Sequence, residues 1–137
     1  KHRELTRDDN NVKVVVYNGV MLLCGQVRSE QLKQLAQSSA EGFDGVVRLV
    51  NEIEVTDEPE GFWRRRGDET ITAHVKTGLL DITSLPGFDP TRINVTTAHR
   101  VVYLMGLVRH AEADAATDVA RNANGVDKVV KLFDYID

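Results

Sequence analysis

A nine-residue stretch that occurs twice constrains the fold of this chain more than any other feature. The first copy covers residues 19–27 (GVMLLCGQV) and the second covers residues 100–108 (RVVYLMGLV), so their central glycines are 81 residues apart (106 − 25). The flanking residues match as well, with identical pairs such as Val14/Val95 and Gly45/Gly125. The 137-residue chain therefore holds one small module twice, and such a repeat decides the number of folding units before any motif is interpreted.

The predicted elements follow the same order in both copies. Asn18-Gly19 suits a two-residue hairpin turn, and Ser29 followed by Glu30 suits the start of a helix. In the first copy we expect strands over residues 12–17, 20–28 and 46–55, with the helix between the last two. In the second copy we expect strands over residues 93–97, 101–109 and 126–136, with a helix over residues 111–123 and His99-Arg100 at the turn.

These elements predict an α+β fold. The two hairpin strands are antiparallel, and the helical crossover makes the third strand parallel to the second. Each module is then a three-stranded mixed sheet with its helices on one face. We expect module 1 at residues 1–55, a linker at 56–67 with Pro59 and Gly61, and module 2 at 68–137.

Module 2 should open with a further helix over residues 68–82. Asp68 is its expected N-cap, and Ile71, Val75, Leu79 and Ile82 fall on one face. Module 2 thus has the order αββαβ, whereas module 1 lacks the opening helix in this chain, and its polar residues 1–11 are expected to be a frayed leader. Because the chain begins at Lys1 rather than Met, we expect an upstream segment, including a signal peptide, to have been removed.

Both faces of the repeated strand are apolar. Side chains alternate between the two faces, and a half-exposed sheet is normally polar on the face away from its helices. We therefore expect the helix-free faces to be covered by the sister module or by another subunit, through an interaction face of Val20, Leu22, Cys24, Val101, Tyr103 and Met105. Gly25 and Gly106 should mark a close backbone approach, against the crossing helix rather than against a ligand.

Composition and motifs argue against several function classes. The net charge of −4 does not fit a dedicated nucleic-acid binder, which usually has a strongly basic domain. The single cysteine excludes an internal disulfide, and the four histidines lack metal-ligand spacing. No nucleophile elbow or phosphate-binding glycine loop occurs. We expect neither an enzyme nor a cofactor or metal site.

The segment Phe62-Trp63-Arg64-Arg65-Arg66 is the most distinctive local motif. An amphipathic Trp beside three guanidinium groups suits an anionic membrane interface, where each basic residue contributes about 1 kcal/mol. The alternative is a linker whose Trp packs between the modules while the Arg side chains stay solvated. The sequence leaves both interpretations open.

The two copies resemble BON domains. The resemblance rests on "YNGVMLLCGQV", a helix and "GVVRLVNEIEV" in the first copy, and on "INVTTAHRVVYLMGLV", a helix and "GVDKVVKLFDYI" in the second. With "ETITAHVKTGLL" between them, the whole of residues 12–136 resembles the dual-BON-domain lipoproteins of Gram-negative bacteria. That family implies a non-enzymatic periplasmic protein, anchored to the outer membrane by an upstream lipidated cysteine, that supports envelope integrity.

The resemblance also implies a lipid-binding site and partners. Family members bind anionic phospholipid through the opening helix of module 2, and here the corresponding exposed positions are Thr70, His74, Lys76, Thr77, Gly78 and Leu80. The best-known member of that family has Trp where this chain has Thr70, so we hypothesise that Trp63 takes over, with Arg64, Arg65 and Arg66 beside it. The alternative function is a protein-interaction adaptor that uses the helix-free sheet faces to engage outer-membrane assembly machinery or a second copy of itself.

Overall fold

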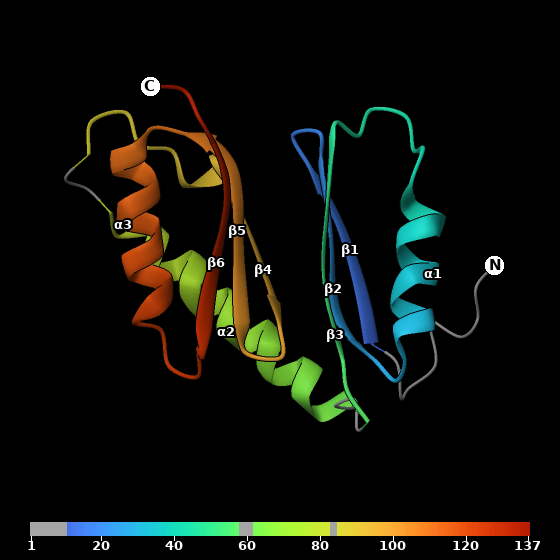
Figure 1. Cartoon of the computed structure of the whole chain (residues 1–137). Coiled ribbons are helices and arrows are strands. Elements are labelled where there is room, and N and C mark those ends of the chain that lie inside the picture. Colours follow the sequence, from blue (N-terminus) through green and yellow to red (C-terminus); the bar gives the residue numbers. More distant parts are fainter. Residues whose placement is uncertain (1–10, 58–61, 83–84) are drawn as a thin grey trace. The chain divides into compact units, whose positions relative to one another are not determined.

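The computed structural model describes residues 11–57, 62–82 and 85–137, without the side chains of residue 11 and residues 62–66. The chain divides into two compact units, Lys1–Arg65 and Arg66–Asp137. Each unit contains one sheet with its helices on a single face (Figure 1). The predicted polar leader at residues 1–11 falls almost entirely outside the described residues.

Over residues 11–57, which the structure describes, the first unit is a three-stranded mixed sheet with one helix. Its elements are β1 (Asn11–Tyr17), β2 (Val20–Val27), α1 (Glu30–Ala40) and β3 (Arg48–Val55). The strand order is β1-β2-β3, with β2 antiparallel to β1 and parallel to β3. Ser29 caps α1 as predicted, because its Oγ accepts a hydrogen bond from the backbone N–H of Leu32 at 3.2 Å.

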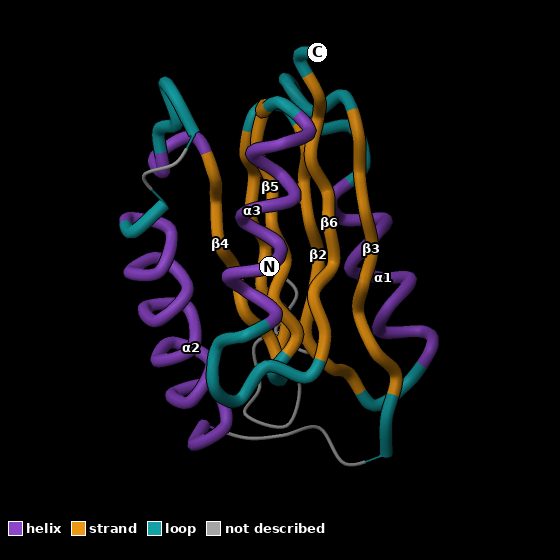
Figure 2. Tube along the Cα trace, turned by 90° about the vertical axis from the view of Figure 1, so that its left-hand side faces the viewer, coloured by secondary structure: helices purple, strands orange, loops and turns teal. Residues whose placement is uncertain are grey.

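The second unit repeats this topology and adds a helix in front of it. Its elements are α2 (Phe62–Leu80), which enters this unit at Arg66, the 3₁₀ turn η2 (Pro90–Arg92), β4 (Ile93–Ala98), β5 (Val101–Val108), α3 (His110–Arg121) and β6 (Lys128–Tyr135). The strand order is β4-β5-β6, again antiparallel and then parallel. Figure 2 shows α2 beside β4, one of the two edge strands of this sheet. The predicted α+β fold of two αββαβ-type modules is confirmed.

The two hairpin turns share one backbone shape despite different sequences. Asn18 and Gly19 have φ of 53° and 81°, and His99 and Arg100 have φ of 53° and 67°. All four residues are therefore left-handed, as a two-residue turn between twisted strands requires. Gly and Asn adopt this conformation at low cost and His at a moderate one, whereas Arg does not, so Arg100 makes the second turn the more strained of the two.

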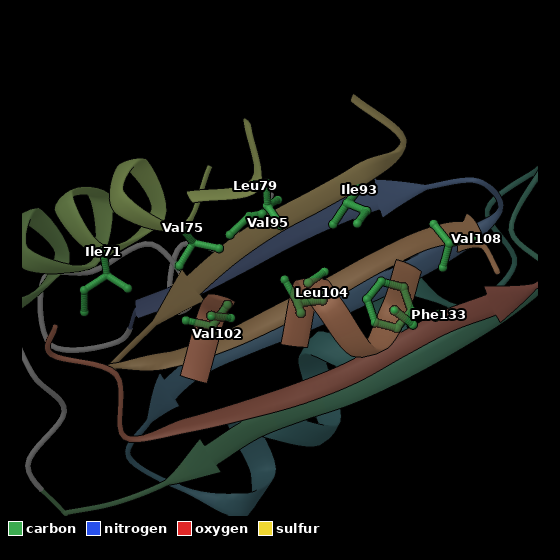
Figure 3. Close-up of a cluster of buried hydrophobic side chains, with 12 residues drawn as sticks. Ile71, Val75, Leu79, Ile93, Val95, Val102, Leu104, Val108 and Phe133 are labelled. Atoms are coloured by element: carbon green, nitrogen blue, oxygen red, sulfur yellow. The ribbon is translucent and has the colours of Figure 1, made fainter. Parts of the chain in front are cut away.

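The core of the second unit lies between its sheet and its two helices. Ile71, Val75 and Leu79 of α2 meet side chains of β4 and β5 in one buried cluster (Figure 3). The helix α3 contributes small residues to the same cluster, which lets it lie close to the sheet: Ala113, Ala116 and Ala120. The corresponding cluster of the first unit draws on α1, β2 and β3.

The predicted start of α2 is wrong. The helix begins at Phe62 rather than at Asp68, so residues 62–67 of the expected linker are helical. Arg and Trp are compatible with a helix, and one glycine inside it costs only about 1 kcal/mol. Asp68 therefore lies inside the helix and is not its N-cap. Its carboxylate is hydrogen-bonded to the turn between β4 and β5.

The role expected of Gly106 is also only half correct. A close backbone approach exists, but a Cβ built on Gly106 would collide with the carbonyl oxygen of Arg92, at the end of η2, rather than with a helix. Glycine at this position therefore lets β5 pass close to the entry of β4.

Candidate functional site

A buried carboxylate fixes the helix α2 against the rest of its unit. Asp68 is 1% exposed. Its Oδ2 accepts a hydrogen bond from the backbone N–H of His99 at 2.8 Å, and its Oδ1 accepts one from Arg100 at 2.9 Å. One turn further along, Thr72 Oγ1 donates to Thr97 Oγ1 at 2.7 Å. Charge-assisted bonds to two turn amides hold both the left-handed turn and the helix.

The rest of α2 divides into a buried and an exposed side. Ile71, Val75 and Leu79 are buried in the core cluster. Among the residues predicted to bind lipid, the exposed ones with described side chains are Thr70, His74, Lys76, Thr77 and Leu80. The helix therefore presents these five positions away from the core.

Gly78 does not belong to that exposed set. It is half-buried, and a Cβ added to it would lie 2.6 Å from Cγ1 of Val119 on α3. Glycine here allows the two helices to approach closely, so the expectation that Gly78 is an exposed position is wrong.

A groove runs along the C-terminal end of α2. It has a volume of about 300 Å³ and lies between the helix and η2, lined by Lys76, Leu79, Leu80, Pro90, Thr91 and Ile93. Leu80 is 67% exposed. The Lys76 ammonium has no ion-pair or hydrogen-bond partner in the part of the chain that the structure describes. The groove thus combines one cation with exposed apolar surface.

The rim of this groove also carries a carboxylate. Asp89 Oδ1 accepts hydrogen bonds from Thr91 Oγ1 at 2.6 Å and from the Thr91 backbone N–H at 3.0 Å. These two bonds, with Arg92 nearby, lower the pKa of the Asp89 carboxyl. Asp89 therefore remains negatively charged at neutral pH, and it limits how much anionic charge the η2 side of the groove can accept.

Sequence reasoning missed Pro90 and Thr91. Their signal is local, because Asp89-Pro90-Thr91 is a good start for a short helical turn, with an acceptor side chain before a proline. It also missed Glu112, which is 1% exposed and accepts from the Arg109 backbone N–H at 2.8 Å and from Arg109 Nη2 at 3.1 Å. These bonds lower the pKa of Glu112, and they stabilise the N-terminus of α3.

Trp63, Arg64, Arg65 and Arg66 lie in the first two turns of α2, and not in a linker. Their side chains are outside what the structure describes, so their role in lipid binding stays a prediction. The helix nevertheless joins this motif and the exposed positions of Thr70–Leu80 in one element.

The predicted interaction faces follow from the strand pairing. Leu22 pairs with Val15 and Val50, and Tyr103 pairs with Thr96 and Val130. The alternate residues of β2 and β5 belong to the helix-packed clusters. The six predicted residues therefore lie on the helix-free faces: Val20, Leu22, Cys24, Val101, Tyr103 and Met105. What covers these faces remains a prediction.

Two general features of the described residues concern membranes and metals. No helix among residues 11–57, 62–82 and 85–137 is long and apolar enough to cross a membrane. In the same residues, no three His, Cys, Asp or Glu side chains are grouped so that they could hold a metal ion.

Comparison with known proteins identifies the repeat. The family model described as "BON domain" matches residues 2–57 and 67–137. The chain is 36% identical over 130 residues to the 21 kDa hemolysin of Actinobacillus pleuropneumoniae, covering 95% of this chain and 65% of that protein. It is 33% identical over 129 residues to the outer membrane lipoprotein DolP of Haemophilus influenzae, covering 94% and 65%. It is 30% identical over 129 residues to the osmotically-inducible protein Y of Escherichia coli, covering 89% and 63%.

The matches extend over both units but not over the whole length of the relatives. The chain spans 63% to 65% of these three proteins. The two matched ranges correspond to the two copies of the glycine-centred strand and the elements around them. The chain therefore belongs to the BON domain family and carries two BON domains, the second of which displays the exposed face of α2.

Proposed function

We propose that this chain is a non-enzymatic part of a bacterial envelope protein and that it docks on anionic phospholipid through the outward side of α2. The observation that carries the proposal is the continuous helix Phe62–Leu80, which brings the Trp-Arg motif and the exposed Thr70–Leu80 positions into one element. The proposal extends to a place in the periplasm at the outer membrane, a lipidated anchor upstream and a role in envelope integrity. The likeness to a protein named outer membrane lipoprotein supports the place at the outer membrane and the anchor.

The spacing within α2 selects which residues should act together. Positions seven apart lie nearly above one another on a helix, two turns apart. Positions 63, 70 and 77 therefore form one column, and positions 66, 73 and 80 form a neighbouring one. Thr70, Thr77 and Leu80 are exposed, so Trp63 and Arg66 occupy columns that face outward in the described part of the helix.

Arg64 and Arg65 occupy different columns. Position 64 continues the column of Ile71 and Gly78, and position 65 continues that of Thr72 and Leu79, which face the core. The proposal therefore assigns the interfacial role to Trp63 and Arg66, together with Lys76 and Leu80. A Trp and a Leu would enter the headgroup region while the cations meet phosphate, a combination typical of interfacial helices.

The test is binding to vesicles of phosphatidylglycerol and phosphatidylcholine, compared with vesicles of phosphatidylcholine alone. We expect binding only to the anionic vesicles, and weaker binding at higher salt because exposed charges are screened. Lys76→Gln should weaken binding about fivefold, since one basic residue near an anionic surface contributes about 1 kcal/mol. Equal binding to both vesicles would refute the proposal.

Matched variants distinguish lipid binding by the exposed side of α2 from non-specific binding by any exposed apolar side chain. Leu80→Ser should reduce binding, whereas Val47→Ser, which removes an apolar side chain 86% exposed in the first unit, should not. The pair Trp63→Ala and Arg66→Ala should reduce binding more than the pair Arg64→Ala and Arg65→Ala. If the second pair has the larger effect, the assignment of the outward columns is incorrect.

The second candidate function is protein docking through the helix-free faces. The strand pairing favours it because it gathers Leu22, Val15 and Val50 at the centre of one such face. In that case a protein partner, such as outer-membrane assembly machinery or a second copy, would protect Leu22, Cys24, Tyr103 and Met105 from exchange. Anionic micelles would leave residues 62–80 unperturbed.

A further inference from the structure

The connection between α3 and β6 contains an asparagine followed by a glycine, Asn124-Gly125 (Figure 1). The chain has this pair at one other place, Asn18-Gly19 in the first hairpin turn. Asparagine is a thermolabile residue, and it is most labile before glycine. The backbone nitrogen of the glycine can attack the side-chain amide carbon, because no Cβ on the glycine obstructs the approach. The local backbone therefore decides which of the two pairs reacts.

The turn around Asn124 is exposed and weakly closed. Asn124 and Gly125 are both exposed, and the Val126 N–H donates to the Ala123 carbonyl at 3.4 Å, which is long for such a bond. Gly125 has φ of 90° and Asn124 is not left-handed, as in a type II turn. Among the residues that the structure describes, none accepts from the Gly125 N–H or donates to the Gly125 carbonyl. The attacking nitrogen is therefore available.

The Asn18-Gly19 pair is held on both sides. The residues that flank it are paired with each other across β1 and β2. The Gly19 carbonyl also accepts hydrogen bonds from the N–H groups of Val47 at 2.8 Å and Arg48 at 3.3 Å. To reach the Asn18 side chain, the Gly19 nitrogen must turn about the Asn18 Cα–C bond. That rotation would break these hydrogen bonds and distort the left-handed hairpin turn.

The first module shows which residue the turn accepts in place of the asparagine. The offset of 80 residues between the paired glycines (125 − 45) turns Asn124-Gly125 into Asp44-Gly45. Gly45 has φ of 84°, and the same backbone hydrogen bond closes its turn at 3.4 Å. The two turns therefore have one backbone geometry, and an aspartate fits at this position without changing it.

The turn around Asn124 also contacts the helix α2. A Cβ added to Gly125 would lie 3.3 Å from Cδ1 of Ile71. The Ile71 side chain is 6% exposed and belongs to the core cluster of the second unit. The main chain of the turn therefore lies against the buried side of α2, so a change in the length of that main chain would alter the contact.

We propose that Asn124 is a site of spontaneous deamidation in the folded chain, that Asn18 is protected from it, and that the isoaspartate product loosens α2. The Gly125 nitrogen bonds to Cγ of Asn124, and its proton passes through solvent to Nδ2, which leaves as ammonia. The resulting succinimide takes up one water molecule. Opening of the ring at Cγ gives aspartate. Opening at the backbone carbonyl gives isoaspartate, whose main chain is one atom longer.

The two products differ in their effect on α2. Aspartate adds a negative charge but keeps the main chain, as Asp44 does in the first module. Isoaspartate lengthens the main chain between Ala123 and Val126, which opens the weak hydrogen bond between them and displaces Gly125 from Ile71. The isoaspartate form therefore loses part of the packing on the buried side of α2, whereas the aspartate form retains it.

The experiment incubates the full chain in warm, mildly alkaline buffer, which favours deprotonation of the attacking nitrogen. Peptide mass spectrometry with electron-transfer fragmentation then measures aspartate and isoaspartate at both sites. We expect Asn124 to react roughly tenfold faster than Asn18, because two hydrogen bonds to Gly19 must break before Asn18 can react. In urea that unfolds the chain, the two sites should react at similar rates. Equal rates in the folded chain, or an unchanged ratio in urea, would overturn the proposal.

Two variants separate the modification from its consequence. Asn124→Gln should remove the reaction at this position and leave that at Asn18 unchanged, because the longer side chain closes a ring far more slowly. Asn124→Asp should leave amide hydrogen exchange around Ile71 and Val75 at the wild-type rate. The purified isoaspartate fraction should exchange the same amides faster. Wild-type exchange in that fraction, or equally fast exchange in Asn124→Asp, would overturn the assigned effect on α2.

Discussion

The contact between Asp68 and the second hairpin turn makes a quantitative prediction for the mutation Asp68→Asn. The carboxylate is 1% exposed and accepts two backbone hydrogen bonds, at 2.8 and 2.9 Å. An amide keeps one acceptor oxygen but turns its NH₂ group toward the other N–H, so one charge-assisted bond is lost and a buried donor is left unpaired. We expect a loss of about 2–3 kcal/mol in the free energy of unfolding.

That loss is large for a unit of this size. The second unit runs from Arg66 to Asp137 and should have roughly 4–10 kcal/mol of total stability, at about 0.05–0.15 kcal/mol per residue. Urea unfolding followed by NMR gives separate signals for each unit, so it measures the free energy of unfolding of the second unit by itself. The matched control is Glu69→Gln, the same change of charge at the next, exposed position, which should stay within about 0.5 kcal/mol of wild type.

A second substitution tests the reason for the contact. Arg100 has φ of 67°, so Arg100→Gly should recover about 1 kcal/mol of left-handed strain, in the wild-type chain and in the Asp68→Asn chain alike. If Asp68→Asn costs no more than Glu69→Gln, the buried carboxylate does not support the turn and the reasoning fails.

Two further predictions concern the contact between α2 and α3 and the N-terminus of α3. Gly78→Ala should lower the thermal unfolding midpoint by an amount corresponding to about 1–3 kcal/mol, because the added Cβ would lie 2.6 Å from Val119 Cγ1, and Val119→Ala should restore most of it. Hydrogen bonds from Arg109 lower the pKa of Glu112 below its ordinary value of 4.5, so its contribution to stability is complete above pH 4.5 and is lost as the pH falls through the folded-state pKa. The difference in unfolding free energy between wild type and Glu112→Gln should therefore shrink in acid.

Much of the fold could be predicted from the sequence because its signals are local and occur twice. Asn18-Gly19 marks a hairpin, Ser29 marks a helix start, and alternation fixes which side of each strand faces the helix. The strands β1, β2, β4 and β5 begin and end within one or two residues of the predicted limits. Repetition of the pattern then settles the topology of the second unit.

The start of α2 and the role of Asp68 could not be predicted in the same way. Pro59 and Gly61 suggest a linker, and an aspartate before an amphipathic stretch normally caps a helix. The partners of Asp68 are 31 and 32 residues away along the chain, so no local pattern contains them. One indirect signal exists, because His99-Arg100 replaces Asn-Gly at a turn that needs left-handed residues, and such a turn requires a stabilising partner.

The support that Asp68 gives to the turn also limits how α2 can meet a membrane. If the helix left its sheet to insert into lipid, its apolar side would be exchanged from protein to hydrocarbon with little gain. The amides of His99 and Arg100 would lose their acceptor, and the left-handed turn would lose its compensation. Docking with the inner face in place keeps all of these contacts and still offers Lys76 and Leu80 to the surface. If α2 docks on lipid as proposed, these contacts favour a helix that lies on the headgroups as a fixed part of the module over one that detaches and inserts.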